Sequence, residues 1–254
     1  MNRVPVIALL AAAPGALLLS LSAGSPAEPP AVTPVLPVVI TPGDADHAPS
    51  DAVVLFDGTD VQLWKHDKDA AAKWKIEDAG DGSKGSRARC LTVAPGSGNL
   101  LSTKAFNDCQ IHIEFATPVK VEGEGQGRGN SGVYIQGRYE VQVLDSYNNT
   151  TYPDGQCGAI YKQHAPLVNA CRGPGQWQTY DIVFRAAKFG ADGKKTVNAR
   201  VTVFQNGVLV QDHSEVTGST GGNISDEGPT PGPIMLQDHG NLTRFRNIWV
   251  RPLN

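Results

Sequence analysis

From residue 51 onward, apolar and polar residues alternate in many short stretches that are separated by turn-forming residues. A period of two is typical of β-strands that bury one face and expose the other. About ten such strands, with Gly, Pro or Asn between them, predict an all-β fold built as a two-sheet antiparallel β-sandwich or jelly roll. The clearest alternating stretches are residues 109–117, 131–143, 177–186, 199–213 and 243–253.

Two of the predicted turns have strong sequence signals. Asn206-Gly207 lies between two alternating runs, and Asn-Gly is the strongest short signal for a β-hairpin. Pro-Gly-Ser-Gly at 95–98 interrupts the apolar stretch 90–103, which predicts a second hairpin. Helix signals are scarce, and the best candidate is the short stretch 67–76, for which a turn is the alternative. Because the composition does not change again and no repeat is visible, we expect one domain over residues 51–254.

The N-terminal segment differs in composition from the rest of the chain. In residues 1–27, one basic residue is followed by an apolar run and then by small residues, which is the pattern of a secretory signal peptide. An uncleaved membrane anchor is the alternative, but the run is at the lower limit for a span and contains two prolines. Residues 28–50 predict an extended Pro-rich linker, because repeated proline supports neither a helix nor a central strand. We therefore expect a secreted, periplasmic or cell-envelope protein without stable membrane insertion after signal cleavage.

Charge and cysteine content narrow the possible partners. The net charge is −3 at pH 7, so no nucleic acid is expected as a partner, because phosphates attract basic proteins. The chain has four cysteines, and an even number favours disulfides in an exported protein. Three connectivities are open, and Cys90–Cys109 with Cys157–Cys171 is the first expectation. A zinc site is the alternative, but no Cys-x-x-Cys or His-x-x-x-His spacing supports it, so no metal site is predicted.

The predicted strand at residues 138–147, with the sequence RYEVQVLDSY, carries several polar side chains between its apolar ones. Alternation places Glu140 and Gln142 together on the polar face. Asp145 joins them only if a β-bulge near residues 143–144 shifts the phase by one position. Even then, Glu140 and Asp145 would be about 13 Å apart along the strand, too far for the close carboxyl pair of a retaining glycosidase. A solvated edge strand is the alternative interpretation of the whole row.

Further polar residues are expected beside this row. Asn130 and Tyr134 project to the same side from the preceding strand, and amides and aromatic rings next to carboxylates are typical of sugar-binding sites. His239 could serve as an acid, a base or an oxyanion donor, because imidazole changes its protonation near neutral pH. Capping the turn that follows is its alternative role. Trp177 and Tyr180 are expected in the core, and a platform for a sugar ring is their alternative role.

Four motifs, in order over about residues 53–254, resemble the 3-keto-disaccharide hydrolase domain family. The motifs are residues 55–64 (LFDGTDVQLW), 130–147 (NSGVYIQGRYEVQVLDSY), 157–184 (CGAIYKQHAPLVNACRGPGQWQTYDIVF) and 234–253 (IMLQDHGNLTRFRNIWVRPL). The resemblance implies a concanavalin A-like sandwich, bacterial export and cleavage of glycosides whose sugar is oxidised at C3. Cys157 and Cys171 depart from the family pattern, as does the glycine-rich segment 123–129.

Cleavage of such a glycoside needs a base near C2, donors at the C3 oxygen and an acid near the glycosidic oxygen. We expect Glu140 or Asp145 to be the base and His239 to be the acid/base or oxyanion donor. The residues expected to contact the carbohydrate substrate are Asn130, Tyr134, Gln142, Arg138, Lys162 and Asp238. No organic cofactor is expected, although a structural Ca²⁺ ion remains open. A non-catalytic carbohydrate-binding module and a structural module of the cell envelope are the alternatives, because one sandwich fold hosts lectins and enzymes alike.

Overall fold

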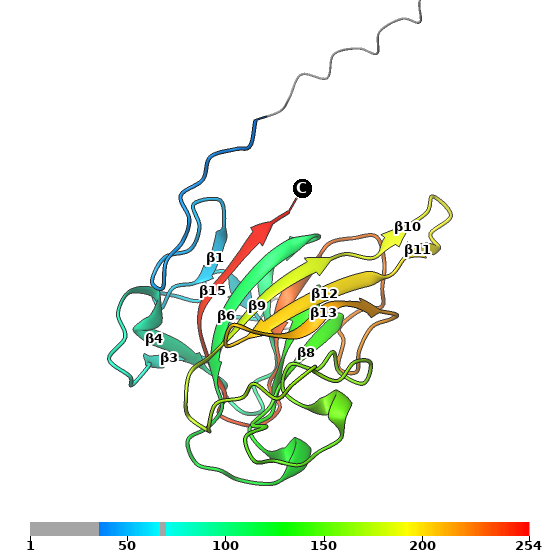
Figure 1. Cartoon of the computed structure of the whole chain (residues 1–254). Helices are drawn as coiled ribbons and strands as arrows, with labels where there is room; N and C mark the ends of the chain where they lie inside the picture. Colours follow the sequence, from blue (N-terminus) through cyan, green and yellow to red (C-terminus); the bar gives the residue numbers. More distant parts are fainter. Residues whose placement is uncertain (1–35, 67–69, 254) are drawn as a thin grey trace, which may run out of the picture. The chain divides into compact units, whose positions relative to one another are not determined.

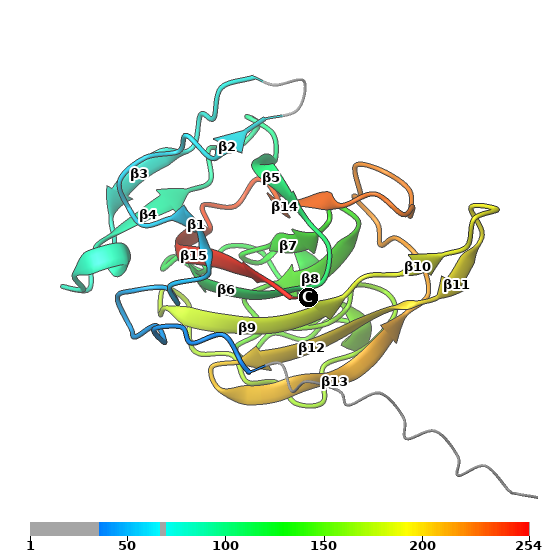
Figure 2. The same ribbon diagram turned by 90° about the horizontal axis from the view of Figure 1, so that it is seen from above.

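The computed structural model describes residues 36–66 and 70–253, so the predicted signal peptide, residues 1–27, lies outside the described residues. Residues Val39–Asn254 belong to one compact unit. Its strands form two antiparallel sheets that face each other (Figures 1 and 2), which confirms the predicted β-sandwich. No helix in the described ranges has the length and hydropathy needed to cross a membrane.

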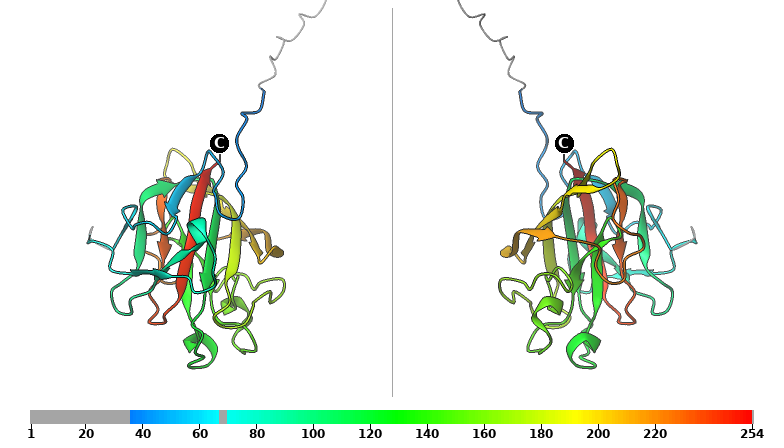
Figure 3. Two further views of the ribbon diagram at one scale, coloured as in Figure 1. Left: turned by 90° about the vertical axis from the view of Figure 1, so that its left-hand side faces the viewer. Right: turned by 90° about the vertical axis from the view of Figure 1, so that its right-hand side faces the viewer.

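The larger sheet contains eight strands. They are β1 (Val53–Phe56), β3 (Lys75–Asp78), β4 (Arg89–Thr92), β6 (Cys109–Ala116), β9 (Gln178–Arg185), β12 (Ala199–Gln205), β13 (Val208–Val216) and β15 (Arg244–Pro252). Their spatial order is β13–β12–β9–β6–β15–β4–β3, and β1 also pairs with β15. Strand β15, red in Figure 3, runs antiparallel to β6.

The smaller sheet contains five strands. They are β2 (Trp64–Lys65), β5 (Leu100–Phe106), β7 (Ser131–Ile135), β8 (Tyr139–Val143) and β14 (Gly232–Leu236). Their spatial order is β2–β5–β14–β7–β8. A separate two-stranded ribbon and three 3₁₀ turns complete the described elements: β10 (Lys188–Phe189), β11 (Lys195–Val197), η2 (Gly85–Arg87), η3 (Gly125–Gly127) and η4 (Pro153–Gly155).

The core lies between the two sheets and follows from the period-two pattern. In β9, Tyr180, Ile182 and Phe184 are fully buried, whereas Asp181 and Val183, between them, are more exposed. Burying an aliphatic or aromatic side chain of this size contributes about 1.5–3 kcal/mol, so these alternating strands hold the layers together. Tyr180 is in the core as predicted.

The Asn206-Gly207 hairpin is confirmed. Gln205 pairs with Val208, and both turn residues have positive φ, 53° and 79°, as a two-residue type I′ turn requires. The hairpin predicted around residues 95–98 is wrong, because β4 pairs with β3 and β15 whereas β5 pairs with β2 and β14. The turn carries the chain from one sheet to the other. The predicted helix is also wrong over its described part, since residues 70–76 contain an isolated bridge and the start of β3.

The cysteine prediction needs correction. All four are free thiols in the structure. A Cys90–Cys109 bond is excluded because β15 lies between β4 and β6 and the two residues face opposite ends of it, roughly 20 Å apart at the spacing of a strand. Cys157 and Cys171 do lie together: Gln205 Nε2 is 3.5 Å from one sulfur and 3.2 Å from the other.

Candidate active site

The hairpin of β7 and β8 carries the predicted polar row on the outer face of the smaller sheet. Val141 packs in the core, whereas Glu140 and Gln142 line a pocket on the other side. Tyr134 lies directly opposite Glu140, and Gly132 lies opposite Gln142. A side chain at Gly132 would collide with the Glu140 carboxylate and the Tyr134 ring, so glycine leaves the space that the carboxylate occupies.

The pocket has a volume of about 240 Å³, which suits a single sugar ring better than a long oligosaccharide. Its lining residues are Asn130, Tyr134, Glu140, Gln142, Tyr161, Gly221, Gly222, Gln237 and His239. The structure therefore brings together Glu140, His239 and three of the predicted substrate contacts.

Glu140 is a buried carboxyl group, with 3% of its surface exposed. Burial raises its pKa to about 8, and the nearby Tyr134 hydroxyl only partly opposes that rise. Tyr134 in turn donates its hydroxyl hydrogen to the Gly221 carbonyl at 2.8 Å and accepts one from Gln237 Nε2 at 3.1 Å. Burial and the Glu140 charge raise the pKa of Tyr134, so the phenol stays neutral. A carboxyl that titrates near neutral pH is suited to proton transfer.

Three amide oxygens around the pocket are buried without a hydrogen-bond partner among the described residues. They belong to Asn130, Gln142 and Gln237. The nitrogens of the same groups are bound: Asn130 Nδ2 donates to the Gln126 carbonyl at 2.7 Å, and Gln142 Nε2 donates to Gln126 Oε1 at 2.9 Å. A buried polar atom without a partner is costly, and several facing one pocket indicate a ligand that donates hydrogen bonds.

Three loops contribute Tyr161, the Gly221–Gly222 pair and His239 to the lining of the pocket. The chain at residues 158–161 runs along the outer edge of β8. The backbone N–H of Gln142 donates to the Ala159 carbonyl at 2.9 Å, and the backbone N–H of Tyr161 donates to the Glu140 carbonyl at 3.2 Å. This pairing covers β8, so the solvated-edge interpretation of the strand is wrong. It also brings Tyr161 into the lining of the pocket, and the Tyr161 hydroxyl lies 2.7 Å from the Tyr152 hydroxyl. His239 is exposed at the mouth, in the loop after β14.

Asp145 lies outside this pocket. The β7–β8 register is regular up to Ser131–Val143, where β8 ends, so the bulge that Asp145 needed to join the row does not form. Leu144, which follows the last residue of β8, still packs in the core. Asp145 does not join the polar row because the strand has already ended. Asp145 Oδ2 accepts from Arg128 Nε at 2.7 Å and lines a neighbouring pocket of about 430 Å³. The Arg128 ion pair balances the charge of Asp145, whereas burial dominates the environment of Glu140.

Three other predicted substrate contacts lie outside the pocket lining. Arg138 is 5% exposed and donates to Gln136, Ser225, Gly228 and Thr230, which ties down the loop before β14. Asp238 accepts from the backbone of Gly98 at 3.1 Å and of Gly240 at 3.0 Å, so it organises the His239 loop. Lys162 is exposed, with its ammonium 3.2 Å from the centre of the Tyr152 ring.

Sequence reasoning missed Gln237 and Tyr161 as pocket residues. Gln237 immediately precedes Asp238 in the motif LQDHGN, where alternation would have placed it beside His239. Tyr161 had no such signal, because its position depends on the pairing of a loop with β8. Within the described ranges, no three His, Cys, Asp or Glu side chains come together as a metal-binding group.

Comparison with known proteins places the chain among carbohydrate-related proteins. The pattern of the 3-keto-alpha-glucoside-1,2-lyase-like domain family matches residues 51–251. A crystal structure of a candidate glycosyl hydrolase from Parabacteroides distasonis is 45% identical, with a TM-score of 0.78 over 88% of this chain and 95% of that chain. Another from the same organism shares the fold at 18% identity, with a TM-score of 0.57 over 80% of this chain and 94% of its own. No protein with a curated description matches the chain.

Proposed function

The chain belongs to the 3-keto-alpha-glucoside-1,2-lyase-like family, also described as 3-keto-disaccharide hydrolases, and on this premise we propose that it is an exported glycosidase that cleaves 3-keto-glycosides. One observation carries the proposal. Glu140, with a pKa raised to about 8, lies in a pocket that also presents three buried amide oxygens without partners among the described residues. Sugar hydroxyls are donors that such oxygens can accept.

Glu140 is the base in this proposal. A ketone at C3 acidifies the hydrogen at C2, and the Glu140 carboxylate removes that proton while the electron pair moves into an enolate on the C3 oxygen. A carboxylate whose pKa is raised by burial is a stronger base than one in water, so the shift favours this step. In this proposal the Tyr161 hydroxyl stabilises the enolate oxygen, since Tyr152 can donate to it and leave its own hydrogen for the substrate.

His239 is the acid that protonates the leaving group. As the enolate collapses, the bond between C1 and the glycosidic oxygen breaks, and that oxygen takes a proton from the His239 imidazolium at the pocket mouth. The product is an unsaturated 2-hydroxy-3-keto sugar. In the hydrolytic variant, water then adds its oxygen to C1 and gives its proton to His239, while Glu140, whose abstracted proton has exchanged with solvent water, protonates C2.

Turnover of 3-keto-trehalose and of a chromogenic 3-keto-glucoside tests the proposal. We expect wild-type protein to release the aglycone and the Glu140→Gln variant to lose at least about 100-fold in kcat/KM. Glu215→Gln removes a half-exposed glutamate of the larger sheet and should leave kcat/KM unchanged. Wild-type protein that binds these sugars but cleaves none of them would contradict the enzymatic proposal and favour a carbohydrate-binding module.

A further inference from the structure

Another pocket lies on the outer face of the larger sheet, away from the β7–β8 hairpin. It has a volume of about 790 Å³. Four arginines and one tryptophan line much of it: Arg87, Arg172, Arg244, Arg246 and Trp177. Asp81 is the acidic residue in the lining. We refer to these five residues and Asp81 as the Arg–Trp pocket. Trp177, predicted for the core, is instead half-buried here.

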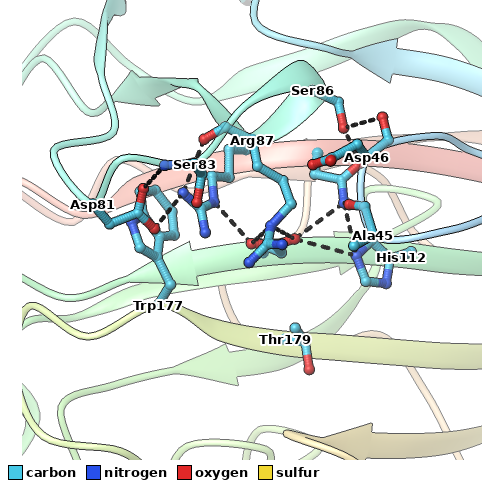
Figure 4. A network of polar contacts seen from close by, with 12 residues as sticks. Ala45, Asp46, Asp81, Ser83, Ser86, Arg87, His112, Trp177 and Thr179 are labelled. Atoms are coloured by element: carbon cyan, nitrogen blue, oxygen red, sulfur yellow. Dashed lines mark hydrogen bonds and ion pairs between the residues drawn. The ribbon is translucent and has the colours of Figure 1, made fainter.

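Two of the four arginines are already neutralised. Arg246 is fully buried, and its Nε donates to Glu114 Oε2 at 2.8 Å while its Nη1 donates to Asp81 Oδ2 at 2.9 Å. Arg87 Nε lies 3.1 Å from Glu114 Oε1. Figure 4 shows Asp81, Arg87 and Trp177 gathered in this network over the strands of the larger sheet.

The other two arginines are bound only to backbone carbonyls within the described part of the chain. Arg172 Nη1 donates to the Trp177 carbonyl at 2.8 Å, and Arg244 donates to the carbonyls of Ala79 and Gly175 at 3.3 Å each. A carbonyl orients a guanidinium group but leaves its charge in place. The pocket therefore keeps an excess of positive charge, and Arg172 is exposed to solvent while Arg244 is partly exposed.

Two buried donors of the same pocket have no acceptor among the described residues. They are Arg246 Nη2 and Trp177 Nε1. The Trp177 ring stacks against Arg246 at 3.9 Å and against Arg244 at 5.0 Å, so the indole and the guanidinium groups face the same space. Unpaired donors beside an excess of positive charge indicate a ligand rich in acceptors and negatively charged.

We propose that the Arg–Trp pocket binds an acidic saccharide through the carboxylate of a uronic acid residue. A guanidinium group binds a carboxylate through two parallel hydrogen bonds, and both the exposed Arg172 and the partly exposed Arg244 keep a charge available for such a contact. The volume suits an oligosaccharide better than an inorganic ion, and the indole offers a sugar both an apolar face and a donor. The site would hold the protein on an acidic glycan while the Glu140 pocket acts on its own substrate.

Calorimetric titration of the Glu140→Gln protein with tri-galacturonate tests this binding without interference from turnover, so the result does not depend on the proposed catalysis. We expect saturable binding that weakens as salt is added, and at least about a tenfold loss of affinity when Arg172→Gln and Arg244→Gln are combined in that protein. The matched control is Arg185→Gln, which removes a half-exposed arginine of the same sheet that pairs with Asp108. It should bind like the parent.

Three outcomes would overturn the proposal. One is an absence of binding to tri-galacturonate, and another is unchanged affinity in the doubly substituted protein. The third is binding of neutral galactotriose, or of sulfate alone, as tight as that of the acidic trisaccharide. A fluorescence titration of Trp177→Phe adds an independent readout: the variant should lose the change in emission that the trisaccharide causes in the parent.

Discussion

Each of the two sheets carries a buried glutamate on its outer face, and the two carboxyl groups have opposite chemistry. Glu140 on the smaller sheet is 3% exposed and Glu114 on the larger sheet is 5% exposed. The pKa of Glu140 is raised to about 8, whereas the pKa of Glu114 is lowered to about 2. The degree of burial alone therefore does not determine whether a carboxyl group can take up a proton near neutral pH or stays ionised.

The difference lies in the partners. Burial alone would raise both pKa values, but at Glu114 hydrogen bonds from His112, Asn247 and Arg246, together with the charge of Arg246, outweigh it. At Glu140 burial meets little more than the Tyr134 hydroxyl. A buried acid without a cation costs stability, and such a cost is usually retained where the group has chemistry to perform. The network around Glu114 instead holds β6 and β15 to the segments packed over them.

Glu114→Gln should give the largest loss of stability. It leaves the buried Arg246 guanidinium with Asp81 as its remaining acidic partner, and breaking a buried ion pair from one side costs about 3–5 kcal/mol. Urea unfolding measures this change in the free energy of unfolding. Glu215→Gln, which breaks the half-exposed pair with Arg200, should cost no more than about 1 kcal/mol. Equal losses in the two variants would show that burial of the pair is irrelevant.

Glu140→Gln should raise stability, in a way that depends on pH. Because the folded pKa of about 8 is above the ordinary value of 4.5, the folded protein binds the extra proton between these values, and stability falls as pH rises through that window. Glutamine mimics the neutral acid and removes the fall. The variant should therefore match wild type near pH 5 and exceed it by about 2–4 kcal/mol at pH 9. Melting temperatures at both pH values measure this, and parallel pH profiles would contradict it.

His239→Asn should have the smallest and most selective effect. We expect at least about a tenfold loss in kcat/KM on 3-keto-trehalose, whose sugar leaving group needs a proton. On a nitrophenyl 3-keto-glucoside the loss should be no more than a few-fold, because nitrophenolate leaves without one. Equal losses on both substrates would assign His239 to another step, such as binding.

Local pattern predicted those features that local geometry decides. Alternation placed Glu140 and Gln142 on the face of the strand opposite to that of Val141, and Asn206-Gly207 predicted the hairpin turn. Each of these features depends on only a few consecutive residues. The end of β8 at Val143 depends on pairing with Ser131, which left Asp145 misplaced. The sequence of the Pro95–Gly98 turn is the same whether its two flanking strands pair with each other or belong to different sheets.

The positions of the remaining site residues depend on contacts between distant parts of the chain. Tyr161 reaches the pocket because a loop pairs with β8, and Arg246 meets Glu114 across β15 and β6 at a separation of 132 residues. The pKa of Glu140 likewise depends on burial by several loops. None of these distances can be read from spacing in one sequence.

The central claim is that Glu140 removes the proton from C2 before the glycosidic bond breaks. A 3-keto-glucoside carrying deuterium at C2 tests it directly, with the product followed by NMR in ordinary water. We predict that the aglycone and a sugar that has lost its C2 deuterium appear at the same rate with wild-type protein, and that neither appears with Glu140→Gln beyond the rate without protein. Release of the aglycone with the C2 deuterium fully retained would contradict the account.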